Sequence, residues 1–175
     1  MRIATILPAL LFATPALAED VVTPPVGYFE AGIVCSQEVI ASEPAPDTIA
    51  GYTNVIETVP DFISTGRVVP GVIGVGFGVK SAAAGENVVL DLTVTVTHPP
   101  MGPDGVTEQS FPGRLGSEVG ISFYELELPY EVVTGEWTLT ASTPKAVIWS
   151  ASFTVVEPRA VPELAGVCGY ADLLS

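Results

Sequence analysis

The sequence predicts an all-β fold, a single antiparallel, immunoglobulin-like β-sandwich. Apolar and polar residues alternate with a period of two in several segments, which is the pattern of a strand with one buried face. No apolar stripe with helical spacing persists for three turns, and 16 prolines and 17 glycines divide the chain into short segments. Short strands separated by turn residues are typical of a β-sandwich.

Residues 1–18 have the features of a signal peptide. One basic residue, Arg2, precedes an apolar run, and Ala16-Leu17-Ala18 supplies an A-x-A cleavage site before two acidic residues. The run is too short and wrongly flanked for a membrane span, and the alternative is a buried N-terminal helix. We expect cleavage after Ala18, a periplasmic or secreted protein, and a β-sandwich domain over residues 19–157.

The first predicted strand alternates inward-facing residues over one short segment: Phe29, Ala31, Ile33 and Cys35. Residues 36–66 follow, with prolines, several acids and no sustained alternation. We therefore expect a long irregular connection there, which carries the chain across to the next strand.

The segment GVIGVGFGVK, residues 71–80, could be a phosphate-binding loop or a strand with one bare face. A phosphate loop needs a helix N-terminus directly after it, and the following AAAGEN does not begin a helix. Alternation predicts a strand whose glycines face one way, leaving room for a covering side chain or a ligand. Three residues are candidates for an aromatic cover: Tyr124, Trp137 and Trp149.

Three later segments show the strand alternation, at residues 88–97, 136–141 and 147–156. Between Gly120 and Leu128 the apolar residues shift from odd to even positions, as a β-bulge would require. The chain then ends in a tail, residues 158–175, for which no regular element is predicted.

The two cysteines, Cys35 and Cys168, lie near opposite ends of the predicted mature chain. An even number of cysteines in an exported protein indicates a disulfide, and no C-x-x-C motif suggests redox or metal chemistry. We predict a Cys35–Cys168 bridge that ties the tail to the domain; the alternative is two free thiols.

The net charge of −14 restricts the partners of this protein. A strongly acidic chain without a basic patch repels nucleic acid and anionic lipid. We therefore expect no nucleic-acid partner, and we find no later apolar run long enough for a transmembrane segment. The sequence does not determine the oligomeric state.

The only histidine, His98, follows the 88–97 strand in the run Thr97-His98-Pro99-Pro100-Met101. A copper site would need further histidine and cysteine ligands, and a zinc site three or four ligands. We predict a structural role for His98, with no metal site and no cofactor. The two prolines are expected to end the strand before a turn at Pro103-Asp104-Gly105.

Catalytic groups are sparse. A serine nucleophile would depend on His98 as its base, and no serine lies in a G-x-S-x-G elbow. Glu125 and Glu127 share a predicted strand face and Glu131 follows closely, so an acid and base pair is conceivable. Because acidic residues on a wet strand face usually serve solvation, we predict no catalytic residues and no enzyme.

Several short motifs, taken in order, resemble the bacterial family catalogued as domain of unknown function 3859. They are Gly32-Ile33, Thr58-Val59-Pro60, Phe77-Gly78, His98-Pro99-Pro100, Tyr124 with Glu131, Gly135-Glu136-Trp137 and Phe153-Thr154-Val155. The resemblance covers roughly residues 26–156 and implies a compact β-domain without an assigned activity, substrate or cofactor. Cys35 departs from the family pattern, and the signal peptide and tail lie outside it.

These observations favour a non-catalytic binding module of the bacterial envelope, with a protein or envelope component as partner. The candidate binding residues are His98, Met101 and Tyr124, near the loop end from His98 to Asp104 or an exposed sheet edge. Two alternatives remain open. One is a metal-binding protein or hydrolase that uses His98 with nearby carboxylates, and the other is a purely structural envelope protein.

Overall fold

The structure is a computed structural model that describes residues 19–174, so the predicted signal peptide lies outside the described residues. Within that range the chain folds into three antiparallel-paired groups of strands, and one short strand is added in parallel. Short helical turns follow the last strand. The predicted all-β, antiparallel architecture is confirmed.

The larger sheet has five strands in spatial order: β1 (Val21–Val22), β11 (Val147–Val156), β10 (Gly135–Ser142), β7 (Leu90–Met101) and β8 (Val106–Leu115). These neighbours pair antiparallel. A sixth strand, β5 (Val68–Pro70), runs parallel to the end of β11.

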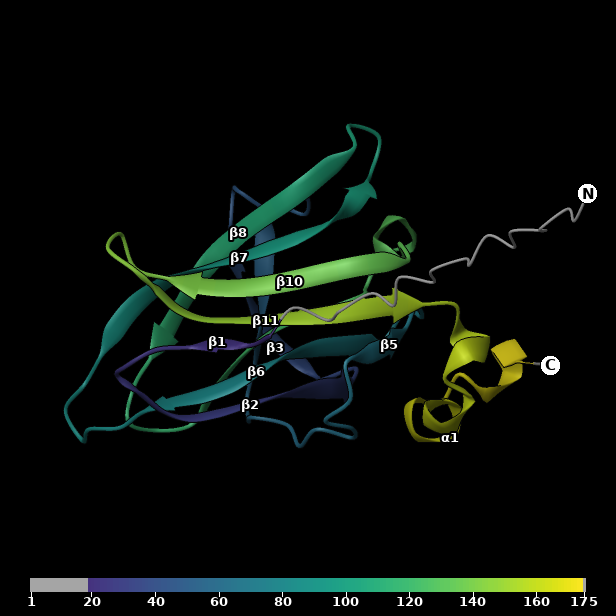
Figure 1. Ribbon diagram of the computed structural model, residues 1–175. Coiled ribbons are helices and arrows are strands. Elements are labelled where there is room, and N and C mark those ends of the chain that lie inside the picture. The colour runs from purple at the N-terminus through teal and green to yellow at the C-terminus, as the bar shows by residue number, and fades with distance from the viewer. Residues whose placement is uncertain (1–18, 175) are drawn as a thin grey trace, which may run out of the picture.

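The second sheet has the order β2 (Val26–Cys35), β6 (Val75–Ala83) and β9 (Gly120–Glu125). A separate hairpin joins β3 (Val39–Pro44) to β4 (Tyr52–Ile56). Figure 1 shows β7, β10 and β11 of the larger sheet on one side of the molecule and β2 and β6 on the other.

The core lies between the two larger sheets. Phe77 on β6 packs against Trp137 on β10, with ring centroids 5.5 Å apart, and against Phe153 on β11, with centroids 5.0 Å apart. All three side chains are fully buried. Because the two sheets face each other and their aromatic side chains pack together between them, the domain is a β-sandwich.

The predicted strand faces point into this core. Leu92, Val94 and Val96 on β7 are buried, as are Trp137, Leu139 and Ala141 on β10. On β11 the inward residues are buried except at the start, where Val147 is exposed. The period-two alternation therefore predicted these strands correctly.

One predicted strand ending was wrong. β7 continues through Pro99 and Pro100 to Met101, because the pairing register with β8 shifts between Thr97 and Met101. A proline placed where the ladder is interrupted removes no strand-pairing hydrogen bond. The turn at Pro103-Asp104-Gly105 is confirmed, with Gly102 and Gly105 at positive φ.

The predicted bulge near residue 124 is also absent. β9 pairs with β6 in an unbroken register from Gly120 to Glu125. Apolar residues occupy both faces of β9, with Tyr124 paired to Phe77 and Phe123 paired to Gly78. A strand that packs on both faces has apolar residues at both odd and even positions, so its sequence resembles that of a strand with a bulge.

The glycine-strand prediction was correct about the faces and wrong about the cover. Val75, Phe77 and Val79 face the core, whereas Ile73 lies before the strand and is half exposed. On the glycine face a Cβ at Gly78 would lie 2.4 Å from the Cβ of Phe123. At the neighbouring position on β2, the ring of Phe62 covers Gly32. The fold itself thus covers this face, and it does so with two phenylalanines.

The expected irregular connection over residues 36–66 contains the β3–β4 hairpin. All six residues of β3 are exposed, so no buried face imposes the alternation that sequence analysis relies on. The segment then returns to the second sheet, where the Ile63 N–H donates to the carbonyl of Ile33 at 2.9 Å.

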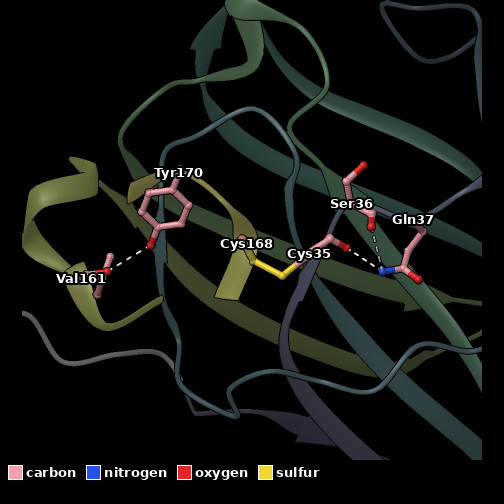
Figure 2. Close-up of a disulfide and its surroundings, with 6 residues drawn as sticks. All are labelled: Cys35, Ser36, Gln37, Val161, Cys168 and Tyr170. Atoms are coloured by element: carbon pink, nitrogen blue, oxygen red, sulfur yellow. Dashed lines mark hydrogen bonds between the residues drawn. A yellow bond between two sulfur atoms is a disulfide. The ribbon is translucent and has the colours of Figure 1, made fainter. Parts of the chain in front are cut away.

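The tail consists of short helical turns, where an irregular segment was predicted. It contains η2 (Pro158–Ala160), η3 (Pro162–Leu164), α1 (Ala165–Cys168) and η4 (Ala171–Leu174). Figure 2 shows Cys168 bonded to Cys35 at the end of β2, and the Tyr170 hydroxyl donating to the carbonyl of Val161 at 3.1 Å. The predicted Cys35–Cys168 disulfide is present in the structure.

Candidate functional site

A groove of about 460 Å³ lies beside the β3–β4 hairpin. All five residues of β4 and all six residues of β9 line it, together with β8 from Phe111 to Arg114. Glu127 and Glu131, which lie after β9, form part of the same wall. The groove therefore runs along strands from each of the three sheets.

Each of these strands is the last in its sheet. Within residues 19–174, β9 pairs only with β6, β8 pairs only with β7, and β4 pairs only with β3. Backbone groups on the outer edge of such a strand are available to an added strand. The edge of β8 is partly occupied, because Ser110 N–H donates to the carbonyl of Asp47 at 3.1 Å and Pro112 has no N–H.

A buried chain of hydrogen bonds lies beneath the groove and joins four strands or turns. The Gln109 amide Nε2 on β8 lies 3.3 Å from His98 Nε2 on β7, and it donates to the Tyr124 hydroxyl on β9 at 3.2 Å. Tyr124 donates in turn to Glu131 Oε1 at 2.9 Å. Glu131 belongs to η1 (Pro129–Glu131).

Both ends of this chain are fixed by the backbone. His98 Nδ1 lies 2.9 Å from the Pro99 carbonyl, which can only accept, so the proton resides on Nδ1 and Nε2 accepts from Gln109. The other Glu131 oxygen accepts the N–H groups of Glu127 and Leu128 at 2.7 and 2.8 Å. Every member of the chain thus has a donor matched to an acceptor.

The hairpin is attached to this chain at two points. The Ile49 N–H, in the turn between β3 and β4, donates to Gln109 Oε1 at 2.7 Å. On β4, the Asn54 amide donates to Glu127 Oε1 at 2.6 Å. The polar chain therefore sets the position of the hairpin, and with it the width of the groove.

Aromatic rings hold the polar chain on its inner side. The Trp137 ring lies 4.8 Å from the His98 ring and 5.2 Å from the Tyr124 ring, measured between centroids. Its indole N–H donates to the Val133 carbonyl at 3.0 Å. Because Trp137 is fully buried, the polar groups beside it are shielded from water.

Burial dominates the titration of these groups. Desolvation lowers the pKa of His98 below its usual value, against smaller opposing effects of the Pro99 carbonyl and Glu131. Desolvation raises the pKa of Tyr124 far above its usual value, and the charge of Glu131 adds to the rise. Both residues are therefore neutral at pH 7.

Glu127, at the edge of the groove, has a pKa raised mainly by desolvation. The carboxylates of Glu125 and Glu131 raise it further, whereas the Asn54 amide lowers it. Burial is thus the main cause of the raised pKa of Glu127, and the neighbouring carboxylates add to it.

The candidate binding residues differ in their access to this groove. His98 and Met101 are 5% and 2% exposed, so neither side chain faces a partner, contrary to what a binding loop from His98 to Asp104 requires. Tyr124 is half buried and lines the groove. Burial follows from β7 continuing past the prolines, which keeps His98 and Met101 on its inward face.

The carboxylates do not form a catalytic pair with His98. One ring nitrogen faces the Pro99 carbonyl and the other the Gln109 amide, so neither contacts a carboxylate. Glu131 is buried and its oxygens accept three hydrogen bonds, while Glu125 and Glu127 belong to the groove wall. Among the described residues, no three His, Cys, Asp or Glu side chains lie close enough to share a metal ion.

Sequence analysis missed Gln109 and Asn54. Gln109 lies on β8, and the Pro112-Gly113 pair in this strand suggests a loop rather than a strand. Asn54 lies on the β3–β4 hairpin, which was not predicted. A glutamine at an inward position of a strand is a signal of a buried amide, but it becomes visible only after β8 is recognised.

The fold and site define a β-sandwich with a groove at its strand edges. The chain belongs to the family described as Domain of unknown function (DUF3859), whose model matches residues 22–155. The suspected family is therefore confirmed. Four residues that carried the resemblance, His98, Tyr124, Glu131 and Trp137, meet in the polar chain and its aromatic backing.

Comparison with solved structures gives a similar chain, a crystal structure of an immunoglobulin-like protein from Pseudomonas aeruginosa. The two are 23% identical, with a TM-score of 0.46, and the match covers 81% of this chain and 100% of the other. No curated protein matches this chain. In the part of the chain that the structure describes, no helix is long and apolar enough to cross a membrane.

Proposed function

We propose that the protein is a non-catalytic binding module of the bacterial envelope, which holds an extended segment of a protein partner in the groove beside β9. The observation that carries this proposal is the position of the groove along the outer edges of β4, β8 and β9. A polypeptide segment can add to such an edge through main-chain hydrogen bonds, while its alternate side chains enter the groove.

The free edge of β9 is the best receptor among the three strands. Its residues are all partly exposed, it contains no proline, and β6 alone pairs with it within the described chain. On β8, by contrast, Pro112 and the Ser110–Asp47 hydrogen bond interrupt the edge. The neighbouring hairpin leaves a groove rather than a flat surface, so the side chains of an added strand would have walls to contact.

Two features support an exported location. The predicted signal peptide indicates export, and the Cys35–Cys168 disulfide suits an oxidising environment such as the periplasm or the cell exterior. We also assign the sandwich to the immunoglobulin-like class, which two facing antiparallel sheets around buried tryptophans support. Immunoglobulin-like domains host many functions, so the groove and not the class carries the functional proposal.

The experiment is selection of a displayed library of random peptides of about twelve residues against the mature, disulfide-bonded protein. Thr53→Trp fills the groove from β4, and Thr107→Trp places the same side chain on β8 outside the groove lining. We expect selected peptides to bind the wild type and Thr107→Trp but not Thr53→Trp. Thermal unfolding of both variants checks that they fold.

A second measurement tests the mode of binding. N-methylation at alternate positions of a selected peptide removes the donors on one edge while keeping its side chains and charge. Loss of binding for one of the two alternating patterns supports strand addition. Peptides that bind Thr53→Trp as tightly as the wild type would contradict the proposal.

A further inference from the structure

The groove carries an excess of negative charge that the fold does not neutralise. Glu43, Glu57 and Glu125 line it, and no hydrogen bond or ion pair is found for these carboxylates among the described residues. The one basic residue in the lining is Arg114, which is exposed on β8. Three free carboxylates therefore face a single guanidinium.

The other two acids in the lining have different roles. Glu131 is buried and belongs to the polar chain. Glu127 accepts a hydrogen bond from Asn54, and its raised pKa reflects burial and the like charges of Glu125 and Glu131. A cationic group placed in the groove would offset this repulsion, so the groove favours a positively charged occupant.

The distribution of the carboxylates distinguishes a basic polypeptide from a metal ion. Glu43 lies on β3, Glu57 follows β4, and Glu125 ends β9, so they come from three different segments along the groove. Within residues 19–174 no cluster of three acidic or other ligating side chains could hold one ion. Separated carboxylates match separated cationic side chains.

Apolar side chains occupy the lining between the charges. Phe111 on β8, Ile121 and Phe123 on β9, and Val55 on β4 are all partly exposed there. Ile121, Phe123 and Glu125 occupy alternate positions of β9, so their side chains share one of its faces. The lining thus offers apolar contacts and a carboxylate side by side to an added strand.

We propose that the extended segment held in the groove is basic, with lysine or arginine side chains set among apolar residues. This inference rests on the proposed function, and it adds the chemical class of the partner. Recognition combines main-chain pairing along β9 with charge attraction to Glu43, Glu57 and Glu125.

The test uses the same displayed library, in which acidic, neutral and basic peptides are all represented. We expect the peptides selected on the wild type to be enriched in lysine and arginine. The triple variant Glu43→Gln, Glu57→Gln, Glu125→Gln removes the charges and keeps the side-chain shapes. We expect it to bind a selected basic peptide about tenfold more weakly, from three exposed charge pairs of roughly 0.5 kcal/mol each.

The matched control is Glu86→Gln, Asp104→Asn, Glu157→Gln, which removes three exposed acids outside the groove lining. It makes the net charge less negative by the same amount, and we expect it to leave the affinity nearly unchanged. Equal weakening in both triple variants would show only a general effect of net charge and would overturn the inference.

The outcomes separate the two proposals. Peptides that bind in the groove without any basic preference would overturn the basic-segment inference and leave the proposed function standing. If no selected peptide distinguishes the wild type from Thr53→Trp, both proposals fail together.

Discussion

Tyr124 and Glu131 form the hydrogen bond that connects the second sheet to the turn after it. The Tyr124 hydroxyl donates to Glu131 Oε1 at 2.9 Å, and the other Glu131 oxygen accepts two backbone N–H groups. A buried carboxylate that accepts three hydrogen bonds is well satisfied. Its partners hold the start of η1 and the end of the groove in place.

Removing the Tyr124 hydroxyl should therefore destabilise the domain. Tyr124→Phe leaves Glu131 Oε1 and one N–H of the Gln109 amide without a partner, and an unsatisfied buried polar group costs about 1–3 kcal/mol. Chemical denaturation of the wild type and the variant measures the loss. Tyr28→Phe is the control, because the Tyr28 hydroxyl bonds Glu30 on the exposed surface, and its expected effect is below about 0.5 kcal/mol. A loss for Tyr124→Phe no larger than that of Tyr28→Phe contradicts the role of the polar chain.

The stability of the domain should fall as the pH falls through the range in which histidine titrates. The pKa of folded His98 is lowered from the usual 6.5, so the unfolded chain binds the proton more readily. Stability is therefore unaffected above about pH 6.5 and is lost between that value and the lower pKa of the folded state. Protonation at Nε2 would also oppose the Gln109 amide donor, whose oxygen is held by Ile49.

His98→Gln removes this titration and tests it directly. Unfolding free energies of both proteins, measured between about pH 7.5 and about pH 5, isolate the contribution of His98 from that of the acids. We expect a steeper loss of stability in the wild type. Parallel profiles would mean that His98 protonates in the folded state without cost.

The close approach at Gly78 should make that position intolerant of any side chain. A Cβ there would lie 2.4 Å from both the Phe123 Cβ and the Ser122 carbonyl oxygen. Gly78→Ala must push β9 away from β6, and overpacking of this kind costs about 1–3 kcal/mol. Gly120→Ala, on the same strand pair, is the control, since a Cβ there meets nothing within 4 Å. We expect its melting temperature to match the wild type, and equal melting temperatures for the two variants would contradict this picture.

Loss of the disulfide should release the tail before it unfolds the sandwich. Replacing both Cys35 and Cys168 with serine removes a bridge between residues 133 positions apart, and the chain-entropy model assigns about 4–5 kcal/mol to a loop of that size. Limited proteolysis measures tail release, and denaturation measures the global loss. Leu164, Ala165 and Tyr170 of the tail also pack in the hydrophobic core, so we expect cleavage after residue 157 to be faster in the variant than in the wild type. An intact tail in the variant would contradict this.

The sequence predicted the parts of the fold that one periodic signal controls. Val94, Trp137 and Phe153 each occupy an inward position of a strand with one buried face, and the alternation predicted them. β3 could not be found this way because none of its residues is buried, and β9 was misread because both of its faces are packed. The alternation of apolar and polar residues reports which face of a strand is buried. A strand with no buried face, or with two, therefore cannot be recognised from it.

The candidate site was less accessible to sequence reasoning for a related reason. His98, Tyr124 and Glu131 stood out as residue types, but their connection passes through Gln109, which is a neighbour only after the two sheets pack. His98 and Met101 were expected at a surface because the prolines beside them suggested a loop. The acidic residues of the groove come from segments distant in sequence, and only the tertiary structure brings them together.

The disulfide has a consequence for the order of folding. Cys35 lies early in the described chain, whereas Cys168 follows it by 133 residues and comes after the last strand, which ends at Val156. Every strand of the sandwich is therefore synthesised before the bond can close. The bridge thus joins two parts of a chain whose strands have all been made, and a chain cut short before Cys168 would keep an unpaired thiol at Cys35.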